Sequence, residues 1–189
     1  LFLLILFSPL IINICILILI FDGKPIIFKQ LRVGKDEKIF SIYKFRTMTL
    51  SKISGSDSDR VNSDNHRISI FGALLRKLSL DELPQLINII SGEMSFIGPR
   101  PLFIDYLKLY NADQRMRHKV IPGISGLAQV NGRNSISWVK RFEYDIFYVK
   151  NQNFILDLKI IILTVLRVLN MSNINQNKYS TMAPFKGQK

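Results

Sequence analysis

The first 21 residues form a long apolar run without a single charged side chain. Only Ser8, Pro9 and Asn13 depart from this pattern. About 20 apolar residues in a helix can cross the hydrocarbon core of a bilayer, whereas a surface helix of a soluble domain has a polar face. A secretory signal would end in a small-residue cleavage site, but Asp22-Gly23-Lys24-Pro25 follows the run. Residues 1–21 are therefore predicted to form a membrane-associated helix.

Pro9 stands near the middle of this run. Proline lacks an N–H and clashes with the preceding turn, so it kinks or breaks a helix, and the Ser8 hydroxyl can serve the freed carbonyl. A kinked helix can span the bilayer or return to the same face, and the residues alone favour spanning. Basic residues follow closely, and the positive-inside rule makes their side cytoplasmic. They are Lys24, Lys29, Arg32, Lys35 and Lys38.

The composition points to an anionic partner. Lys and Arg number 26 against 14 Asp and Glu, which suits nucleic acid, acidic lipid or a phosphorylated substrate. A length of 189 residues indicates one domain with an appendage, and the start at Leu1 suggests a fragment whose first residues are missing. The single Cys15 excludes a disulfide framework and a Cys-rich zinc site. No P-loop, G-x-G-x-x-G or G-x-S-x-G occurs, which excludes the corresponding ATPases, Rossmann enzymes and serine hydrolases.

Two β-rich runs, 24–33 and 38–48, flank Gly34-Lys35-Asp36-Glu37 and predict a hairpin. Lys44 and Arg46 are two residues apart, so they share one face of the second strand. Such a pair of cations needs either an anion or open solvent, and a solvated edge is the simpler alternative. The Ser/Asp/Asn-rich residues 49–67 are predicted to form a mobile flap or an active-site lid.

Asp81 and Glu82 are the candidate acidic residues. Ser79 and Glu82 fit a capping box, whereas Pro84 favours a later helix start with Asp81 as the cap. In both alternatives the carboxylates lie at a helix N-terminus, where the macrodipole favours their ionised form. Capping alone explains most such pairs, but an exposed carboxylate can also be a nucleophile or a metal ligand.

A turn with two prolines, residues 98–101, places Arg100 at its apex. Fixing one guanidinium is unfavourable unless it meets a carboxylate or a phosphate. A basic cluster at 115–119 follows, and then Gly-rich turns at 122–126 and 129–134, the second of which carries Arg133. Glycine lets the backbone approach a ligand closely. Lys44, Arg46, Arg100 and Arg133 are the cations available to bind a substrate diphosphate.

Helices are predicted over residues 68–79, 137–151 and 154–170. The third is apolar enough to be a core helix or to lie in the bilayer interface. The aromatic residues between Trp138 and Tyr148 suit core packing and an interfacial belt equally. The last 18 residues, 172–189, are polar and are predicted to form a loose tail.

Three long motifs occur in the chain: KIFSIYKFRTM at 38–48, SLDELPQLINIISGEMSFIGPRPL at 79–102 and PGISGLAQVNGRN at 122–134. Together they resemble the bacterial sugar transferases that act as monotopic phosphoglycosyl transferases, over roughly residues 5–170. The likeness is greatest to the small enzymes that begin protein N-glycan assembly in epsilon-proteobacteria. One departure is the short basic segment that precedes the apolar helix in the family and is missing here.

The resemblance implies an α/β fold, a small membrane-associated globular domain with a β-hairpin and interfacial amphipathic helices. Residues 1–21 would be a re-entrant membrane helix that turns at Ser8-Pro9, which reverses the preference for spanning. Residues 22–171 would be a transferase domain on the cytoplasmic face of the bacterial inner membrane, followed by the tail 172–189.

The activity implied is transfer of a sugar-1-phosphate from a UDP-sugar to undecaprenyl phosphate, with release of UMP and a requirement for Mg²⁺. By resemblance, Asp81 is the nucleophile that forms a phospho-aspartate, and Glu82 is a metal ligand, with Asp81 beside the same metal. The sugar implied is an N-acetylated amino sugar such as diacetylbacillosamine.

Two other classes of protein would also be basic and membrane-bound. A nucleic-acid binder needs base-stacking aromatics or a recognition helix, and neither is recognisable here. A non-catalytic scaffold would not need Asp81, Glu82 and Arg100 in constrained turns. The partners expected are therefore a UDP-sugar, undecaprenyl phosphate and inner-membrane lipids, and no nucleic acid.

Overall fold

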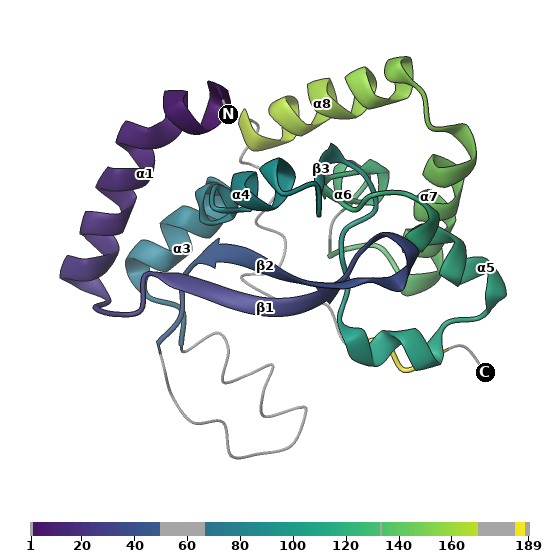
Figure 1. Ribbon diagram of the computed structural model, residues 1–189, viewed down its shortest axis with the longest axis horizontal. Helices are drawn as coiled ribbons and strands as arrows, with labels where there is room; N and C mark the ends of the chain where they lie inside the picture. The colour runs from purple at the N-terminus through teal and green to yellow at the C-terminus, as the bar shows by residue number, and fades with distance from the viewer. Residues whose placement is uncertain (1, 50–66, 133, 170–183, 188–189) are drawn as a thin grey trace.

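The computed structural model describes residues 2–49, 67–132, 134–169 and 184–187. A small mixed domain of helices and short strands follows one long N-terminal helix (Figure 1). The helices are α1 (Phe2–Phe21), α3 (Ile70–Lys77), α4 (Gln85–Ile90), α5 (Ala112–Arg115), α6 (Leu127–Val130), α7 (Trp138–Asn151) and α8 (Phe154–Leu169). The strands are β1 (Ile27–Val33), β2 (Ile39–Phe45), β3 (Ser95–Ile97) and β4 (Gly123–Ser125). The 3-10 segments are Lys35–Glu37, Leu80–Glu82, Ile104–Leu109 and Met116–Lys119.

The apolar N-terminal run forms one continuous helix, α1, with Pro9 inside it. Pro9 cannot donate to the carbonyl of Ile5 four residues earlier, and the Ser8 hydroxyl donates to that same carbonyl at 2.7 Å. The expected role of Ser8 is thus confirmed. The helix continues through Pro9, and the proline only removes one backbone hydrogen bond from it. Re-entry into the same membrane face stays a prediction.

The C-terminal half of α1 packs on the domain, whereas most of its surface is exposed. Ile14 and Ile18 are buried with Phe45 of β2 and Leu75 of α3. By length and composition α1 is able to cross a membrane, with 11% of its most apolar stretch buried in the protein. Apolar side chains of α8 are also largely exposed, Phe154 and Ile155 among them. In Figure 1, α8 runs along the upper edge of the molecule and α1 rises towards the same edge.

The predicted hairpin is confirmed. Strands β1 and β2 pair antiparallel, with Ile27 opposite Phe45 and Val33 opposite Ile39. Their connection is tight, because Asp36 and Glu37 adopt positive φ values of 52° and 60°. This register fixes which side chains of the two strands share a face.

The other two strands, β3 and β4, pair in parallel through very close backbone contact. A Cβ on Gly98 would lie 2.5 Å from the carbonyl oxygen of Ile121, and one on Gly123 would lie 2.1 Å from the nitrogen of Gly98. The glycines of residues 122–126 therefore allow two backbones to approach each other. The expectation that this turn also approaches a ligand stays a prediction, and its residues Ile124 and Ser125 line a cavity.

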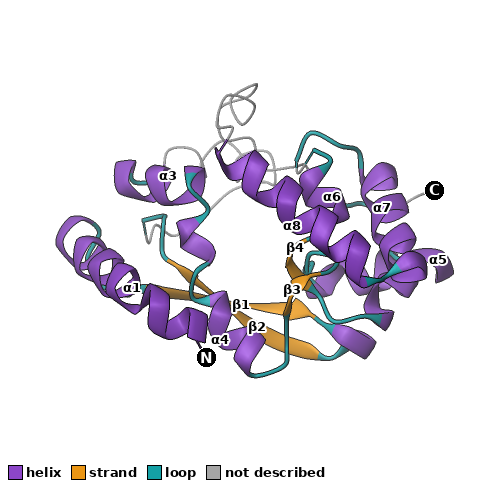
Figure 2. Ribbon diagram, turned by 90° about the horizontal axis from the view of Figure 1, so that it is seen from above, coloured by secondary structure: helices purple, strands orange, loops and turns teal. Residues whose placement is uncertain are grey.

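The three helices predicted from periodicity are observed as α3, α7 and α8. Figure 2 shows α6, α7 and α8 grouped on one side of the molecule and α1 and α3 on the other. Trp138 and Phe142 of α7 pack with Tyr106, Tyr110 and Phe185. Phe185 is 4% exposed, so the expected loose tail is wrong for residues 184–187, whose one aromatic ring completes this cluster. The remainder of the tail, residue 133 and nearly all of the predicted lid at 49–67 lie outside the described residues.

Candidate active site

Asp81 and Glu82 occupy a 3-10 turn, Leu80–Glu82, that precedes helix α4. Neither capping alternative is correct. Ser79 has a left-handed conformation, with φ of 56° and no side-chain capping bond, and α4 begins only at Gln85. The two carboxylates therefore serve no helix cap.

Glu82 is held by two cations from different elements. Lys44 Nζ of β2 donates to Glu82 Oε1 at 2.7 Å, and Arg100 Nη2 donates to the same oxygen at 2.6 Å. Burial alone would raise the pKa of Glu82, but Arg100 and Lys44 outweigh it and hold that pKa well below its usual range. Glu82 is therefore ionised at neutral pH.

Asp81 is held much more loosely. Its Oδ2 lies 4.0 Å from Lys44 Nζ. Burial raises the pKa of Asp81; Lys44 opposes this rise, and the charge of Glu82 adds to it. Of the two carboxylates, Asp81 is therefore the one held less tightly by the cations of the site.

Asn88 of α4 fixes the strand that carries Lys44. This fully buried amide accepts the N–H of Tyr43 at 3.2 Å and donates to the carbonyl of Ser41 at 2.8 Å and to Glu93 Oε2 at 2.7 Å. Because Asn88 and the acidic turn belong to one short segment, these bonds set the position of Lys44 relative to Asp81 and Glu82.

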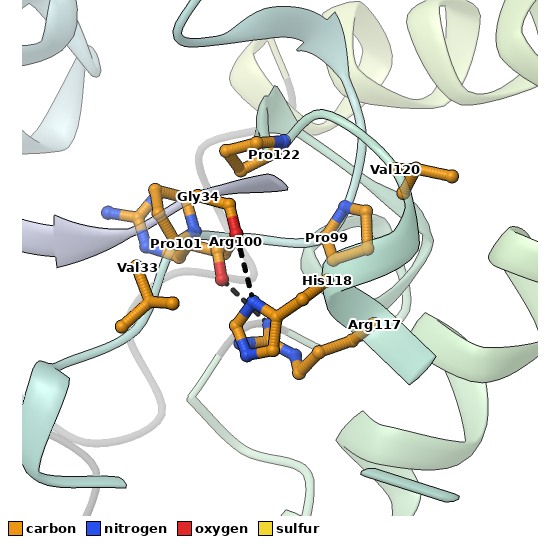
Figure 3. Close-up of a pocket in the computed structure, with 9 residues that line it drawn as sticks. All are labelled: Val33, Gly34, Pro99, Arg100, Pro101, Arg117, His118, Val120 and Pro122. Carbon is orange, nitrogen blue, oxygen red and sulfur yellow. Dashed lines mark hydrogen bonds between the residues drawn. The ribbon is translucent and has the colours of Figure 1, made fainter. Parts of the chain in front are cut away.

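A buried ion pair holds the backbone of Arg100 at the apex of the two-proline turn. Arg117 Nη2 donates to Asp145 Oδ2 at 2.8 Å and to the backbone carbonyl of Arg100 at 2.7 Å. Figure 3 shows Arg117 reaching that carbonyl, with His118 beside it against the carbonyl of Gly34. Arg117 therefore positions Arg100 and is not free to bind a substrate anion.

His118, which the sequence placed in the basic cluster, carries no charge at neutral pH. Its burial, assisted by the neighbouring Arg117, lowers the pKa of His118 to about 4. The ring is neutral at physiological pH, and its Nδ1 lies 3.2 Å from the carbonyl oxygen of Gly34. The sequence cluster at 115–119 thus contains two residues with structural roles.

The acidic turn opens into a cavity of about 930 Å³. Its walls come from the hairpin, from the turn of Arg100 and from helices α6, α7 and α8. Asp81, Glu82, Lys44 and Arg100, four of the residues expected from the sequence, all line it. A cavity of this size accommodates a nucleotide-sized ligand.

Arg46 lines the cavity too, but it has another task. Its guanidinium donates to the carbonyl of Gly23 at 2.6 Å and to that of Asp22. These carbonyls directly follow the C-terminal end of α1, where a cation is favourable. Arg46 therefore connects the end of α1 to the hairpin. Arg133, the last of the expected phosphate-binding residues, lies outside the described residues.

Five cavity-lining basic residues were not among the expected site residues: Lys29, Arg32, Arg67, Arg76 and Arg141. Arg32 of β1 lies over the ring of Phe103, and Arg76 of α3 donates to Thr47 Oγ1 at 2.8 Å. Arg32 could have been found by following the alternation of the hairpin, which places it on the same face as Lys44.

The donor set suits Mg²⁺ shared with a substrate better than a metal bound by the protein alone. No cluster of three or more His, Cys, Asp or Glu occurs within the part of the chain that the structure describes. Mg²⁺ usually takes one or two carboxylates and completes its shell with water and substrate phosphates. Asp81 and Glu82 supply such a pair, and both cations of Glu82 contact its Oε1, not its Oε2.

A carboxylate pair among cations, beside an apolar helix, is typical of an enzyme that acts on phosphorylated substrates at a membrane. The chain matches the bacterial sugar transferase family over residues 1–171, so it belongs to that family. The sugar transferase EpsL of Bacillus subtilis is 51% identical over 165 residues, which cover 87% of this chain and 80% of EpsL. The exopolysaccharide production protein ExoY of Rhizobium meliloti is 39% identical over 176 residues, covering 86% and 78%.

A third relative has a more explicit name. The UDP-glucose:undecaprenyl-phosphate glucose-1-phosphate transferase of Klebsiella pneumoniae is 40% identical over 175 residues. The match covers 87% of this chain but only 37% of that protein. None of these three names refers to protein N-glycan assembly, so that part of the expectation stays a prediction.

Proposed function

We propose that this protein is a phosphoglycosyl transferase that moves a sugar-1-phosphate from a UDP-sugar to undecaprenyl phosphate and releases UMP. The observation that carries the proposal is that two adjacent carboxylates differ in their contacts with cations. Glu82 is bound by Lys44 and Arg100 at 2.7 and 2.6 Å, whereas Asp81 faces the same cavity with only a 4.0 Å cation contact. The names of family members that act on UDP-glucose and undecaprenyl phosphate support it.

The reaction is a double displacement through Asp81. A carboxylate oxygen of Asp81 attacks the β-phosphorus of the UDP-sugar, and the bond from this phosphorus to the bridging oxygen breaks as UMP leaves. An oxygen of undecaprenyl phosphate then attacks the same phosphorus and releases the Asp81 carboxylate. Covalent catalysis divides one difficult transfer into two easier ones.

The cations of the site act on the charge of the diphosphate. Arg100 and Lys44 sit where they can stabilise negative charge on phosphate oxygens while they keep Glu82 ionised. Asp81 and the second oxygen of Glu82 would hold Mg²⁺. When bound, this ion would supply positive charge that offsets the charge on the departing UMP.

The sugar carried by the donor is the finer part of the proposal. The resemblance to N-glycan enzymes favours an N-acetylated amino sugar such as diacetylbacillosamine, whereas the names of three relatives specify glucose. We retain the amino sugar as the prediction on the resemblance alone, and a panel of UDP-sugars decides between it and glucose.

The membrane is the place where the acceptor is found. Exposed apolar side chains on α1 and α8 provide a surface that fits lipid. We infer that α1 enters the bacterial inner membrane from the cytoplasmic face and returns to it, with the cavity on the cytoplasmic side. Basic residues after α1 support this orientation.

The test is a UMP-release assay with the full chain in detergent or nanodiscs. Undecaprenyl phosphate, Mg²⁺ and a panel of UDP-sugars are supplied, including UDP-glucose, UDP-galactose, UDP-N-acetylglucosamine and UDP-diacetylbacillosamine. The proposal expects UMP and a lipid-linked diphospho-sugar in equal amounts from one UDP-sugar. A folded protein that releases no UMP from any member of the panel would contradict it.

A further inference from the structure

Arg32 of strand β1 is a cation of the cavity without an acidic partner. Its guanidinium carbon lies 3.7 Å from the centre of the Phe103 ring, and its Nη2 donates to Gln30 Oε1 at 2.6 Å. Its Nε is shielded from solvent and has no hydrogen bond. No ion pair is made by Arg32 with any residue the structure describes.

Three other cations of the cavity are already engaged with protein oxygens. Lys44 and Arg100 contact Glu82, and Arg46 contacts the carbonyls at the end of α1. Arg32 therefore differs from Lys44, Arg46 and Arg100, the three described residues among the four cations that the sequence suggested for phosphate binding. A shielded charge without a direct ion pair is unfavourable, and a bound anion would supply that ion pair.

The fold brings Arg32 to the dyad. The hairpin register pairs Arg32 with Phe40 and Lys44 with Phe28. Residues 28, 30 and 32 of β1 therefore share a face with residues 40, 42 and 44 of β2. The N–H of Val33 donates to the carbonyl of Leu102 at 3.2 Å, which joins this end of β1 to the turn that carries Arg100.

The electrostatics agree with this placement. Burial, and then the nearby Arg100 guanidinium, lower the pKa of Arg32 to about 10. Two guanidinium groups directed into one cavity repel each other until an anion lies between them. The arrangement suits a phosphate group, which planar guanidinium groups bind through paired hydrogen bonds.

We propose that Arg32 binds the phosphate group that lies opposite Asp81 across the transferred phosphorus. The inference rests on the proposed double displacement. In-line displacement puts the attacking and leaving oxygens on opposite sides of the phosphorus. UMP leaves from the side opposite Asp81, and the acceptor phosphate attacks from that same side. Arg32 therefore holds the phosphate of UMP in the first step and the phosphate of the lipid acceptor in the second.

The test compares Arg32→Gln and Arg32→Lys with the control Lys38→Gln, all in the full chain. Lys38 is an exposed cation of the same hairpin that does not line the cavity. Binding of UMP and of uridine is measured by calorimetry, and the KM for undecaprenyl phosphate is measured with the best UDP-sugar. Uridine has the same base and ribose as UMP but no phosphate, so it reports whether the cavity keeps its shape.

Arg32→Gln should weaken UMP binding roughly tenfold to a hundredfold, the effect of losing hydrogen bonds to a charged group, and leave uridine binding unchanged. The KM for undecaprenyl phosphate should rise by a similar factor. Arg32→Lys should bind UMP more weakly than the unmodified protein and more tightly than Arg32→Gln, because lysine keeps the charge and loses the planar donors. Lys38→Gln should bind UMP like the unmodified protein.

Three results would overturn the proposal. They are unchanged UMP binding in a folded Arg32→Gln variant, equal losses for UMP and uridine, and an effect on only one of the two phosphate ligands. UMP binding needs no turnover, so a protein that binds UMP through Arg32 but transfers no sugar would separate this proposal from the proposed function.

Discussion

Asp81 and Glu82 are adjacent in the chain, and their environments shift their pKa values in opposite directions. Burial raises the pKa of Asp81, while Arg100 and Lys44 overcome burial and lower that of Glu82. One carboxylate is thus fixed and charged, and the other remains able to react. This difference comes from geometry, since both cations contact Oε1 of Glu82.

Asp81→Asn should abolish turnover, by roughly a thousandfold or more, as the removal of a nucleophile does. The amide has the same size as the carboxyl group but cannot form the covalent intermediate. UMP release is measured beside the thermal midpoint, with Asp113→Asn as the control because Asp113 is exposed on α5. Near-normal UMP release by the folded Asp81→Asn variant would rule out the covalent role.

Glu82→Gln should lower activity about a hundredfold, the scale of one fixed electrostatic contact in an active site. The amide is a poorer ligand for a hard cation and leaves Lys44 and Arg100 without their counter-charge. A Mg²⁺ titration should need a higher concentration for half-maximal activity. An unchanged titration curve would count against Glu82 as a metal ligand.

Acidification should inactivate the enzyme at a higher pH than an ordinary aspartate would allow. Attack requires ionised Asp81, and the pKa of this group lies above the ordinary value of 3.8. Activity is therefore present above the raised pKa and is lost as the pH falls through it. The rate of UMP release is measured against pH under conditions where the protein stays folded, and a limb at or below the ordinary value would contradict the raised pKa.

Asn88→Leu should lower both stability and activity. The change leaves the N–H of Tyr43 and the carbonyl of Ser41 unpaired, at about 1–3 kcal/mol for each buried group. Because β2 then loosens, Lys44 should hold Glu82 less well, and kcat should fall. Asn151→Ala is the matched control, since this exposed amide contacts only a carbonyl within α7. Equal thermal midpoints for Asn88→Leu and the unmodified protein would refute this positioning role.

The sequence identified the elements that depend on local pattern, and it missed contacts between distant residues. Periodicity predicted the hairpin and the helices α3, α7 and α8, and the motif around Asp81 predicted the acidic pair. Arg117 and Asp145 are 28 positions apart, and Asn88 and Tyr43 are 45 apart. No spacing rule relates such residues, because the tertiary fold brings them together.

Two contacts have a physical cause that the sequence did not indicate. Arg46 donates to the carbonyls of Asp22 and Gly23, which follow α1, and it still lines the cavity, so its expected role in phosphate binding stays a prediction. The tail looked loose because polar residues dominate it. The aromatic Phe185 was the available sign that part of it packs on the domain.

Pro9→Ala should move the N-terminus of α1 across the membrane. The substitution restores an N–H that can bond the carbonyl of Ile5, which now takes the Ser8 hydroxyl. A straight helix of 21 residues reaches about 31 Å, enough to span, and activity should fall although residue 9 does no chemistry. A cysteine placed ahead of residue 1 is tested in intact cells with a membrane-impermeant reagent. Labelling of the unmodified helix from outside would show that it spans.

The most direct test of the account is to trap the intermediate. The full chain is incubated with Mg²⁺ and a UDP-sugar that it turns over, without undecaprenyl phosphate, and the protein is analysed by intact mass and peptide mapping. The account predicts one UMP released per protein molecule and a mass increase of one sugar phosphate on the peptide that contains Asp81. Stoichiometric UMP release with no adduct, or an adduct on another residue, would contradict it.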